Sequence, residues 1–248
     1  MKLETYTMLL AAAAVPATAH YTFSQLIING NMEGTDWQYI REHQRGYMPT
    51  FIEEAAVSED FRCNQGASSG ANTEVFTVHP GDTIALKQAF GGTGMEHPGP
   101  GQVYMSLAPG SVQEYDGSGE WFKVYQELVC SNSGPEGFQT TNWCSWSEDR
   151  IEFTLPTIPD GEYLVRAEHI PLHGAHAGTP EFYYACAQVK VEGGGGEAPQ
   201  PTTMIPGVYQ IGDEAISFSV WSGFTEYPYI PGPDVISGGE TRGSASGM

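Results

Sequence analysis

Short runs in which apolar and polar residues alternate recur along the chain between residues 74 and 191. Two of them flank the turn Pro80-Gly81-Asp82, and the others follow it: "EVFTVHPGDTIALKQAF", "GQVYMSLAP", "WFKVYQEL", "RIEFTLP", "GEYLVRAEHI" and "FYYACAQVKV". A period of two places successive side chains on opposite faces of a strand. Strands at this spacing, punctuated by glycine and proline, predict an all-β fold, an antiparallel β-sandwich.

The remaining segments lack this alternation. Residues 25–62 and 126–148 are irregular and are predicted to be long surface loops, which in a compact domain are usually functional or disordered. Residues 191–203, "VEGGGGEAPQPTT", are typical of a flexible linker. The stretch that follows is too short for most modules, so we expect one domain over 20–236 that closes over itself. The end, 237–248, is predicted to be a disordered tail.

The first nineteen residues have the parts of a secretory signal peptide. Lys2 supplies the positive charge, Met8 to Val15 form an apolar run too short to span a bilayer, and Ala17-Thr18-Ala19 end it with small residues. The alternative is an alanine-rich helix that opens a cytosolic domain, but Pro16 interrupts the run. Cleavage after Ala19 would make His20 the first residue of a secreted, extracellular protein.

The composition restricts the classes of molecule that the chain could bind. Aspartate and glutamate number 30 against 10 lysines and arginines, which gives a net charge of −20. Such a balance argues against nucleic acids and membranes as partners and suits a neutral substrate. Four cysteines in a secreted chain indicate two disulfides, and their spacing leaves all three connectivities open.

Histidines carry the candidate metal chemistry. A free His20 offers a metal two nitrogens, its α-amine and its imidazole, and a second imidazole would complete a T-shaped set of three that favours copper over zinc. His97, in the rigid loop "GMEHPGPGQVYM", is the best second imidazole. His43 and His79 are interpreted as structural or surface residues.

The segment "HGAHAGTPEFYYACAQV" adds two further candidates. Glu181 and Tyr183 are two residues apart on a predicted strand and therefore point to one face. A tyrosine at the open end of this strand would sit axially above a metal, with the carboxylate beside it.

These residues together resemble the fungal lytic polysaccharide monooxygenases of auxiliary-activity family 9. The similarity rests on "HYTF" at the expected new N-terminus, "HPG" in mid-chain and "FYYACAQVKV" near the end. It extends to "DWQYIRE", "EDFRC", "EWFKVYQE", "YLVRAEHIPLH" and "IPGVYQ", and so covers nearly the whole chain after the leader.

The resemblance implies an immunoglobulin- or fibronectin-like sandwich with one copper on a flat face. His20, His97 and Tyr183 match the copper-binding residues of the family. The disulfides would join Cys63 to Cys186 and Cys130 to Cys144.

This chain departs from the family at two points. Glu181 stands where the family has a glutamine, although related chitin-active families use a glutamate there. His173 matches a histidine beside the copper, but its spacing to position 181 is one residue shorter than in the family. His169 and His176 are close enough to compete for that role.

The function implied by the resemblance is copper-dependent oxidative cleavage of β-1,4-glucan chains of cellulose, at C1 or C4. The co-substrate would be O2 or H2O2, and the electron donor a small phenol, ascorbate or cellobiose dehydrogenase. We expect a monomer whose Tyr47 and Tyr227 stack on sugar rings; for Tyr229, packing within a loop is an equal expectation. The alternatives are a secreted copper-binding protein without catalysis and a glycan-binding sandwich without metal.

Overall fold

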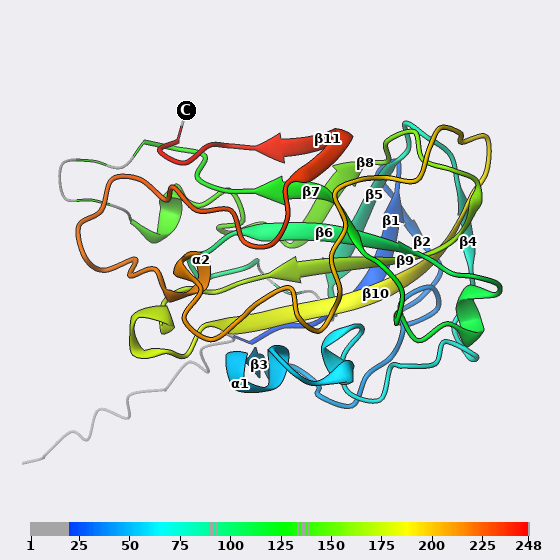
Figure 1. Cartoon of the computed structure of the whole chain (residues 1–248), viewed down its shortest axis with the longest axis horizontal. Coiled ribbons are helices and arrows are strands. Elements are labelled where there is room, and N and C mark those ends of the chain that lie inside the picture. Colours follow the sequence, from blue (N-terminus) through cyan, green and yellow to red (C-terminus); the bar gives the residue numbers. More distant parts are fainter. Residues whose placement is uncertain are drawn as a thin grey trace, which may run out of the picture.

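A computed structural model describes residues 20–89, 92, 94–132, 134, 137 and 139–247. Within them the chain forms two β-sheets that face each other (Figure 1). The four-stranded sheet has the order β2-β1-β5-β8 and consists of β1 (Phe23–Ile28), β2 (Asn31–Glu33), β5 (Thr83–Gln88) and β8 (Arg150–Thr154).

The seven-stranded sheet has the order β11-β7-β6-β9-β10-β3, with β4 pairing alongside β10. Its strands are β3 (Thr50–Phe51), β4 (Phe76–Val78), β6 (Gly101–Leu107), β7 (Phe122–Glu127), β9 (Gly161–His169), β10 (Glu181–Val191) and β11 (Val235–Arg242). The alternating runs predicted from the sequence thus become β4 to β10, and the predicted sandwich is confirmed.

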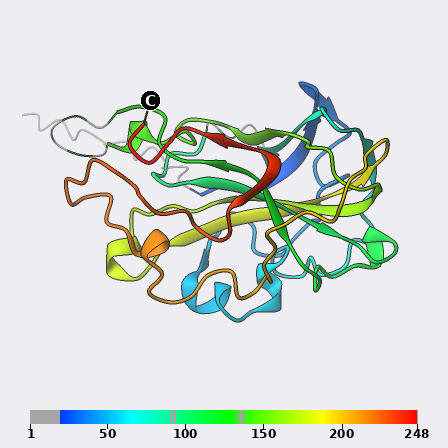
Figure 2. The ribbon, with the colours of Figure 1, turned by 45° about the horizontal axis from the view of Figure 1, so that its top comes forward.

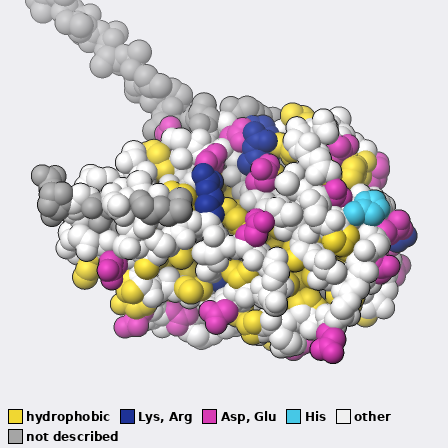
Figure 3. All heavy atoms as spheres, turned by 90° about the horizontal axis from the view of Figure 1, so that it is seen from above, with side chains coloured by type: hydrophobic (Ala, Val, Ile, Leu, Met, Phe, Trp, Pro, Cys, Tyr) yellow, Lys and Arg dark blue, Asp and Glu magenta, His cyan; other side chains and the backbone are white. Residues whose placement is uncertain are grey.

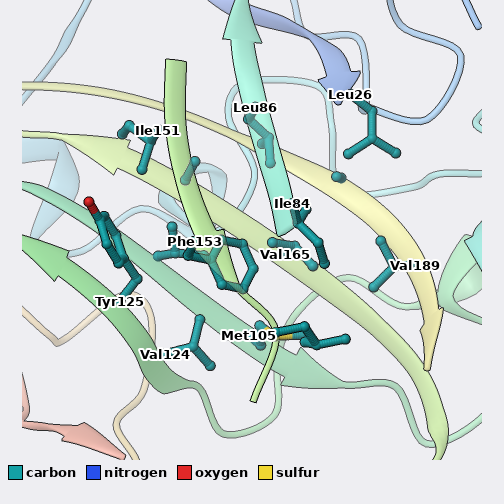
Figure 4. Close-up of a cluster of buried hydrophobic side chains, with 14 of the residues drawn as sticks. Leu26, Ile84, Leu86, Met105, Val124, Tyr125, Ile151, Phe153, Val165 and Val189 are labelled. Atoms are coloured by element: carbon teal, nitrogen blue, oxygen red, sulfur yellow. The ribbon is translucent and has the colours of Figure 1, made fainter. Parts of the chain in front are cut away.

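An apolar cluster fills the space between the two sheets, and we call it the inner cluster (Figure 4). It consists of the inward-facing side chains of both sheets, among them Leu26, Ile84, Leu86, Met105, Val124, Ile151, Phe153, Val165 and Val189. The strands β5, β9 and β10 contribute every second residue to this layer, which is the physical reason for the alternation in their sequences.

A second cluster covers the outer face of the seven-stranded sheet, and we call it the outer cluster. Its sheet side includes Tyr104, Leu164 and Tyr184, and its loop side includes Ile52, Phe61, Ile205, Ile216 and Tyr227. The covering segments run across β6, β9 and β10 in Figures 1 and 2. The prediction that 25–62 is a long surface loop is therefore wrong in part: its start forms β1 and β2, and its end packs on β10.

Short helical turns punctuate these covering segments. They are α1 (Ile52–Ala55), α2 (Glu214–Ser217), η1 (Glu59–Phe61), η3 (Val112–Glu114), η4 (Thr140–Asn142) and η5 (Ala175–Ala177). Among the residues that the structure describes, no helix has the length and apolarity needed to cross a membrane.

Two further predictions are corrected at the C-terminal side. Residues 191–203 do not form a free linker, because Thr203 exchanges backbone hydrogen bonds with Trp121. The tail predicted to be disordered is instead ordered over most of its length. Its residues up to Arg242 belong to β11, which pairs in parallel with β7, and Ser244 exchanges backbone hydrogen bonds with Val129. The predicted signal peptide, 1–19, lies outside the described residues.

Two disulfides tie the loops to this frame. Cys63 bonds to Cys186 of β10 across 123 residues, and Cys130 bonds to Cys144. Both pairings agree with the expectation from the family resemblance. The first bond fixes the covering segment around η1 against the outer face of β10.

Candidate metal centre

Tyr183, the third residue of β10, brings the two predicted copper-binding histidines together. The centroid of its ring lies 6.4 Å from that of His20, which approaches edge-on, and 6.2 Å from that of His97. His20 is exposed whereas Tyr183 is buried, so the imidazoles stand between the core and solvent. The three residues are 163 positions apart in sequence at the extremes, yet the fold places them at one end of the sandwich.

The loop that carries His97 is fastened to the segment after β9. The amides of Ile170 and Leu172 donate to the carbonyls of Pro100 and Pro98, at 2.9 and 2.8 Å. Between them Gly99 comes so close to Ile170 that a Cβ atom on it would lie 1.9 Å from the Ile170 carbonyl oxygen. Only glycine permits this approach. It holds the His97 ring over His173, with ring centroids 4.5 Å apart.

Glu181 connects Tyr183 to His173. The Tyr183 hydroxyl donates to Oε2 of Glu181 at 2.9 Å, and Nε2 of His173 lies 3.4 Å from Oε1. Burial raises the pKa of this carboxyl, but the hydrogen bonds from His173 and Tyr183 outweigh it and hold the pKa below its ordinary value. Glu181 is therefore ionised at neutral pH, and the predicted shared face of Glu181 and Tyr183 is confirmed.

The donors present fit a copper ion. The Tyr183 hydroxyl proton is directed at Glu181, which leaves the oxygen lone pairs for another partner. Two imidazoles beside this oxygen, with the α-amine that cleavage would free on His20, make a nitrogen-rich set of the kind copper favours. Within the described residues no group of three or more His, Cys, Asp or Glu side chains is arranged to hold a metal. A site of two imidazoles and an amine needs no such group.

Two further residues lie against Tyr183: Tyr21, which the sequence did not indicate, and His169, which it indicated only as a competitor of His173. The Tyr21 ring stacks on Tyr183 with centroids 4.2 Å apart, and its hydroxyl hydrogen-bonds to Nδ1 of His169. His169 Nε2 faces the Gly99 carbonyl at 3.3 Å, so Nε2 carries the proton and Nδ1 accepts. Burial, with His97 nearby, lowers the pKa of His169 to about 3 and keeps it neutral.

A signal for His169 exists in the sequence, but only in the register of two strands. His169 is the last residue of β9 and Tyr183 is the third residue of β10, and the two pair directly across the ladder. Reading that register requires knowing that β9 and β10 are neighbours. Of the three histidines that competed for the place beside Glu181, His169 faces Tyr21 and His176 is exposed, whereas His173 contacts the carboxylate.

The predicted stacking tyrosines differ from each other. Tyr47 is 44% exposed, as a sugar-stacking residue requires. Tyr227 is 0% exposed, and its hydroxyl donates to the carbonyl of Ala215 at 2.7 Å, so the prediction that its ring meets substrate is wrong. Its ring packs in the outer cluster because the loop after α2 folds over the sheet. Tyr229 is half-buried, with its ring centroid 6.1 Å from that of Tyr227.

The two histidines interpreted as structural or surface residues have other neighbours. His43 is buried, and its Nε2 forms a 2.8 Å hydrogen bond with Thr22 Oγ1. His79 is exposed beside Asp82. Acidic side chains occur at several places on the face shown in Figure 3 and basic ones at few, consistent with the charge of the whole chain.

Comparison with known proteins defines the class. The model of Auxiliary Activity family 9 (formerly GH61) matches residues 20–229. An AA9 family lytic polysaccharide monooxygenase D of Emericella nidulans is 48% identical over 96% of this chain and 85% of its own length. A monooxygenase A of the same family from Aspergillus fumigatus is 47% identical, covering 97% and 84%.

Solved structures agree. A cellulose-active polysaccharide monooxygenase from M. thermophila superposes with a TM-score of 0.72 at 29% identity, over 89% of this chain and 100% of that one. The extended catalytic domain of H. jecorina LPMO9A shares the fold, with a TM-score of 0.75 at 21% identity over 92% and 97%. The fold and sequence thus define a copper-dependent polysaccharide monooxygenase. The chain belongs to Auxiliary Activity family 9, whose members are generally secreted.

Proposed function

We propose that this protein is secreted after cleavage at Ala19–His20 and oxidatively cleaves β-1,4-glucan chains of cellulose, at C1 or C4 of the sugar. His20, His97 and Tyr183 would hold one copper ion. The observation that carries the proposal is the convergence of both imidazoles on one tyrosine ring at the end of the sandwich. The printed description of the M. thermophila relative as cellulose-active supports the choice of substrate.

Copper would supply the one-electron chemistry that activates O2 or H2O2, with electrons from a small phenol, ascorbate or cellobiose dehydrogenase. The protein's own side chains would orient the metal ligands and hold protons beside them. Tyr183 stays protonated and donates its hydroxyl hydrogen to Glu181, because burial and the neighbouring carboxylate raise the pKa of Tyr183 above the ordinary value. His173, at 3.4 Å from Glu181 Oε1, provides a proton-carrying nitrogen at the edge of the site.

The test begins with protein secreted by a fungal host. We expect mass spectrometry to find His20 as the first residue, and calorimetry to find one tightly bound Cu(II). With ascorbate and amorphous cellulose, the products should include aldonic acids or gem-diols. A matched control with Gly-Ser added before His20 replaces the amine by an amide and should bind copper orders of magnitude more weakly. Equal affinity of the two proteins would contradict the proposed ligand set.

A second candidate function is copper binding without catalysis, and Glu181 is the observation that favours it. The carboxylate stands where the family has a glutamine, and its charge next to the metal candidates would favour Cu(II) over Cu(I). We expect the wild type to be active and Glu181→Ala to bind copper but lose about 10–100-fold in activity, a usual effect of removing a group that orients metal ligands. Wild-type protein without oxidised products, together with activity in Glu181→Gln, would establish the second candidate instead.

A further inference from the structure

Trp221 is a large exposed aromatic residue beside the candidate metal centre. Its side chain is 58% exposed, although the preceding residue Val220 is buried in the outer cluster. The indole Nε1–H donates to the backbone carbonyl of His173 at 2.8 Å. One edge of the ring is thus fixed by a hydrogen bond while much of the ring surface faces solvent.

His173 leads from this indole into the site. Its imidazole stacks on His97 with centroids 4.5 Å apart and an interplanar angle of 24°, and its Nε2 lies 3.4 Å from Glu181. The turn η5 begins two residues after His173, and α2 packs on η5; Figures 1 and 2 show the two side by side. A single residue therefore separates the exposed indole from His97 on one side and from Glu181 on the other.

We propose that Trp221 stacks on a sugar ring of the glucan chain and at the same time positions His173 through its indole N–H. This inference rests on the proposed function and names a residue that the sequence had not indicated. An indole presents a wide apolar face to the C–H surface of a pyranose and keeps one polar edge for a fixed partner. Since Tyr227 is buried, Trp221 supplies an exposed ring on the loop after α2, and its hydrogen bond to His173 places that ring beside the candidate metal centre.

The two roles make separate demands on the side chain. Stacking needs an aromatic face, whereas positioning needs the N–H donor. Trp221→Phe keeps the first and removes the second, and Trp221→Ala removes both. Ile211→Ala is a matched control, because Ile211 is 71% exposed and apolar but contributes no ring.

The first measurement is adsorption of the secreted protein to microcrystalline cellulose. We expect Trp221→Ala to bind about fivefold more weakly, the usual value of one stacked aromatic, while Trp221→Phe and Ile211→Ala stay within about twofold of wild type. The second is NMR of the His173 imidazole in metal-free protein as cellohexaose is added. Wild type should show a shift of these resonances, and Trp221→Phe should bind cellohexaose with the shift lost.

The outcomes are distinguishable. If the wild type adsorbs to cellulose and Trp221→Ala adsorbs equally well, the inference is overturned and the proposed function stays intact. A His173 shift that persists in Trp221→Phe would overturn the positioning role. Wild type that binds neither cellulose nor cellohexaose would overturn the proposed substrate, and the inference with it.

Discussion

The inner and outer clusters are similar in extent but differ in what they bury. The inner cluster, between the sheets, is mainly aliphatic and aromatic, and residues of the strands form most of it. The outer cluster includes fully buried charges: Arg41 and the pair Arg166 and Glu168 lie on its side of the seven-stranded sheet. The inner cluster lies between the faces of the two sheets. The outer cluster is covered by irregular loops, whose buried backbone groups need polar partners.

Arg41 shows how the outer layer meets that need. Its guanidinium donates to four backbone carbonyls, those of Ala67, Ser68, Val112 and Tyr115, and its Nε donates to Gln188 of β10. Loop carbonyls that no strand could pair with are thereby satisfied inside the protein. The inner layer has no such requirement, because each of its strands is paired within a sheet.

The largest expected effect comes from breaking the buried ion pair. Arg166 Nη2 and Glu168 Oε2 are 2.6 Å apart with both side chains fully buried, and Tyr209 donates to the other oxygen of Glu168 at 2.6 Å. Glu168→Leu should lower the free energy of unfolding by about 4 kcal/mol, because it leaves an uncompensated buried cation. Urea denaturation measures this loss of stability.

The matched control removes both charges. Arg166→Met combined with Glu168→Leu should recover most of the loss, since no charge remains to be solvated. A single Glu168→Leu variant with wild-type stability would mean that the stacking of Arg166 on Phe61 and Tyr184 is enough to stabilise its charge.

The inner cluster should respond to lost volume instead. Leu86 is fully buried between the sheets, and Leu86→Ala should cost about 3 kcal/mol through lost transfer energy and the cavity left behind. Val57→Ala, at a position 75% exposed, should leave the urea midpoint unchanged. Replacing a charged residue in addition should not restore the stability that Leu86→Ala loses. Such a restoration would show that charged groups contribute to the inner cluster.

Glu127 is a buried carboxyl group at the edge of the otherwise apolar inner cluster, two residues after Tyr125 on the same face of β7. Burial raises its pKa from 4.5 to about 7, against the attraction of Arg242. Between these values the native state binds more protons than the unfolded state, so this residue lowers stability as the pH rises through that window. Glu127→Gln should therefore leave stability unchanged near pH 4 and raise it by about 3 kcal/mol at pH 8.

Thermal unfolding across this pH range measures the effect of Glu127→Gln. Glu127 and Glu240 both line one surface pocket, in which Glu240 is exposed. The control Glu240→Gln removes this exposed carboxylate and should keep the wild-type pH dependence of stability. Identical profiles for Glu127→Gln and wild type would mean that Glu127 ionises in the native state as it does in the unfolded chain.

The smallest expected effect concerns two tyrosines of the covering loops. Tyr47→Ala should weaken adsorption to cellulose by about 1 kcal/mol, because the side chain is exposed, and should leave copper affinity unchanged. The control Tyr227→Phe loses the hydrogen bond to Ala215 and about 1 kcal/mol of stability, but should adsorb normally. Normal adsorption of Tyr47→Ala would remove Tyr47 from the substrate face.

The sequence by itself determined the strands β4 to β10 and the candidate metal residues. Alternation is a local property, and one buried face is enough to produce it. His20, His97, Glu181 and Tyr183 were identifiable because their chemistry and their match to a family lie in short segments. The same holds for the cysteine pairs, which the resemblance assigned.

Only the tertiary structure decided which loop residues are buried. Tyr227 is buried, whereas Trp221, six residues earlier, is exposed. The difference arises because the loop folds over the seven-stranded sheet, and the loop's own sequence does not show which of its residues meet that sheet. The position of His169 beside Tyr183 depends on the register of β9 and β10. The strand β11 depends on pairing with β7, although it has two adjacent glycines and little alternation. These features arise from contacts between segments far apart in the chain, and such contacts leave no periodic pattern in either segment.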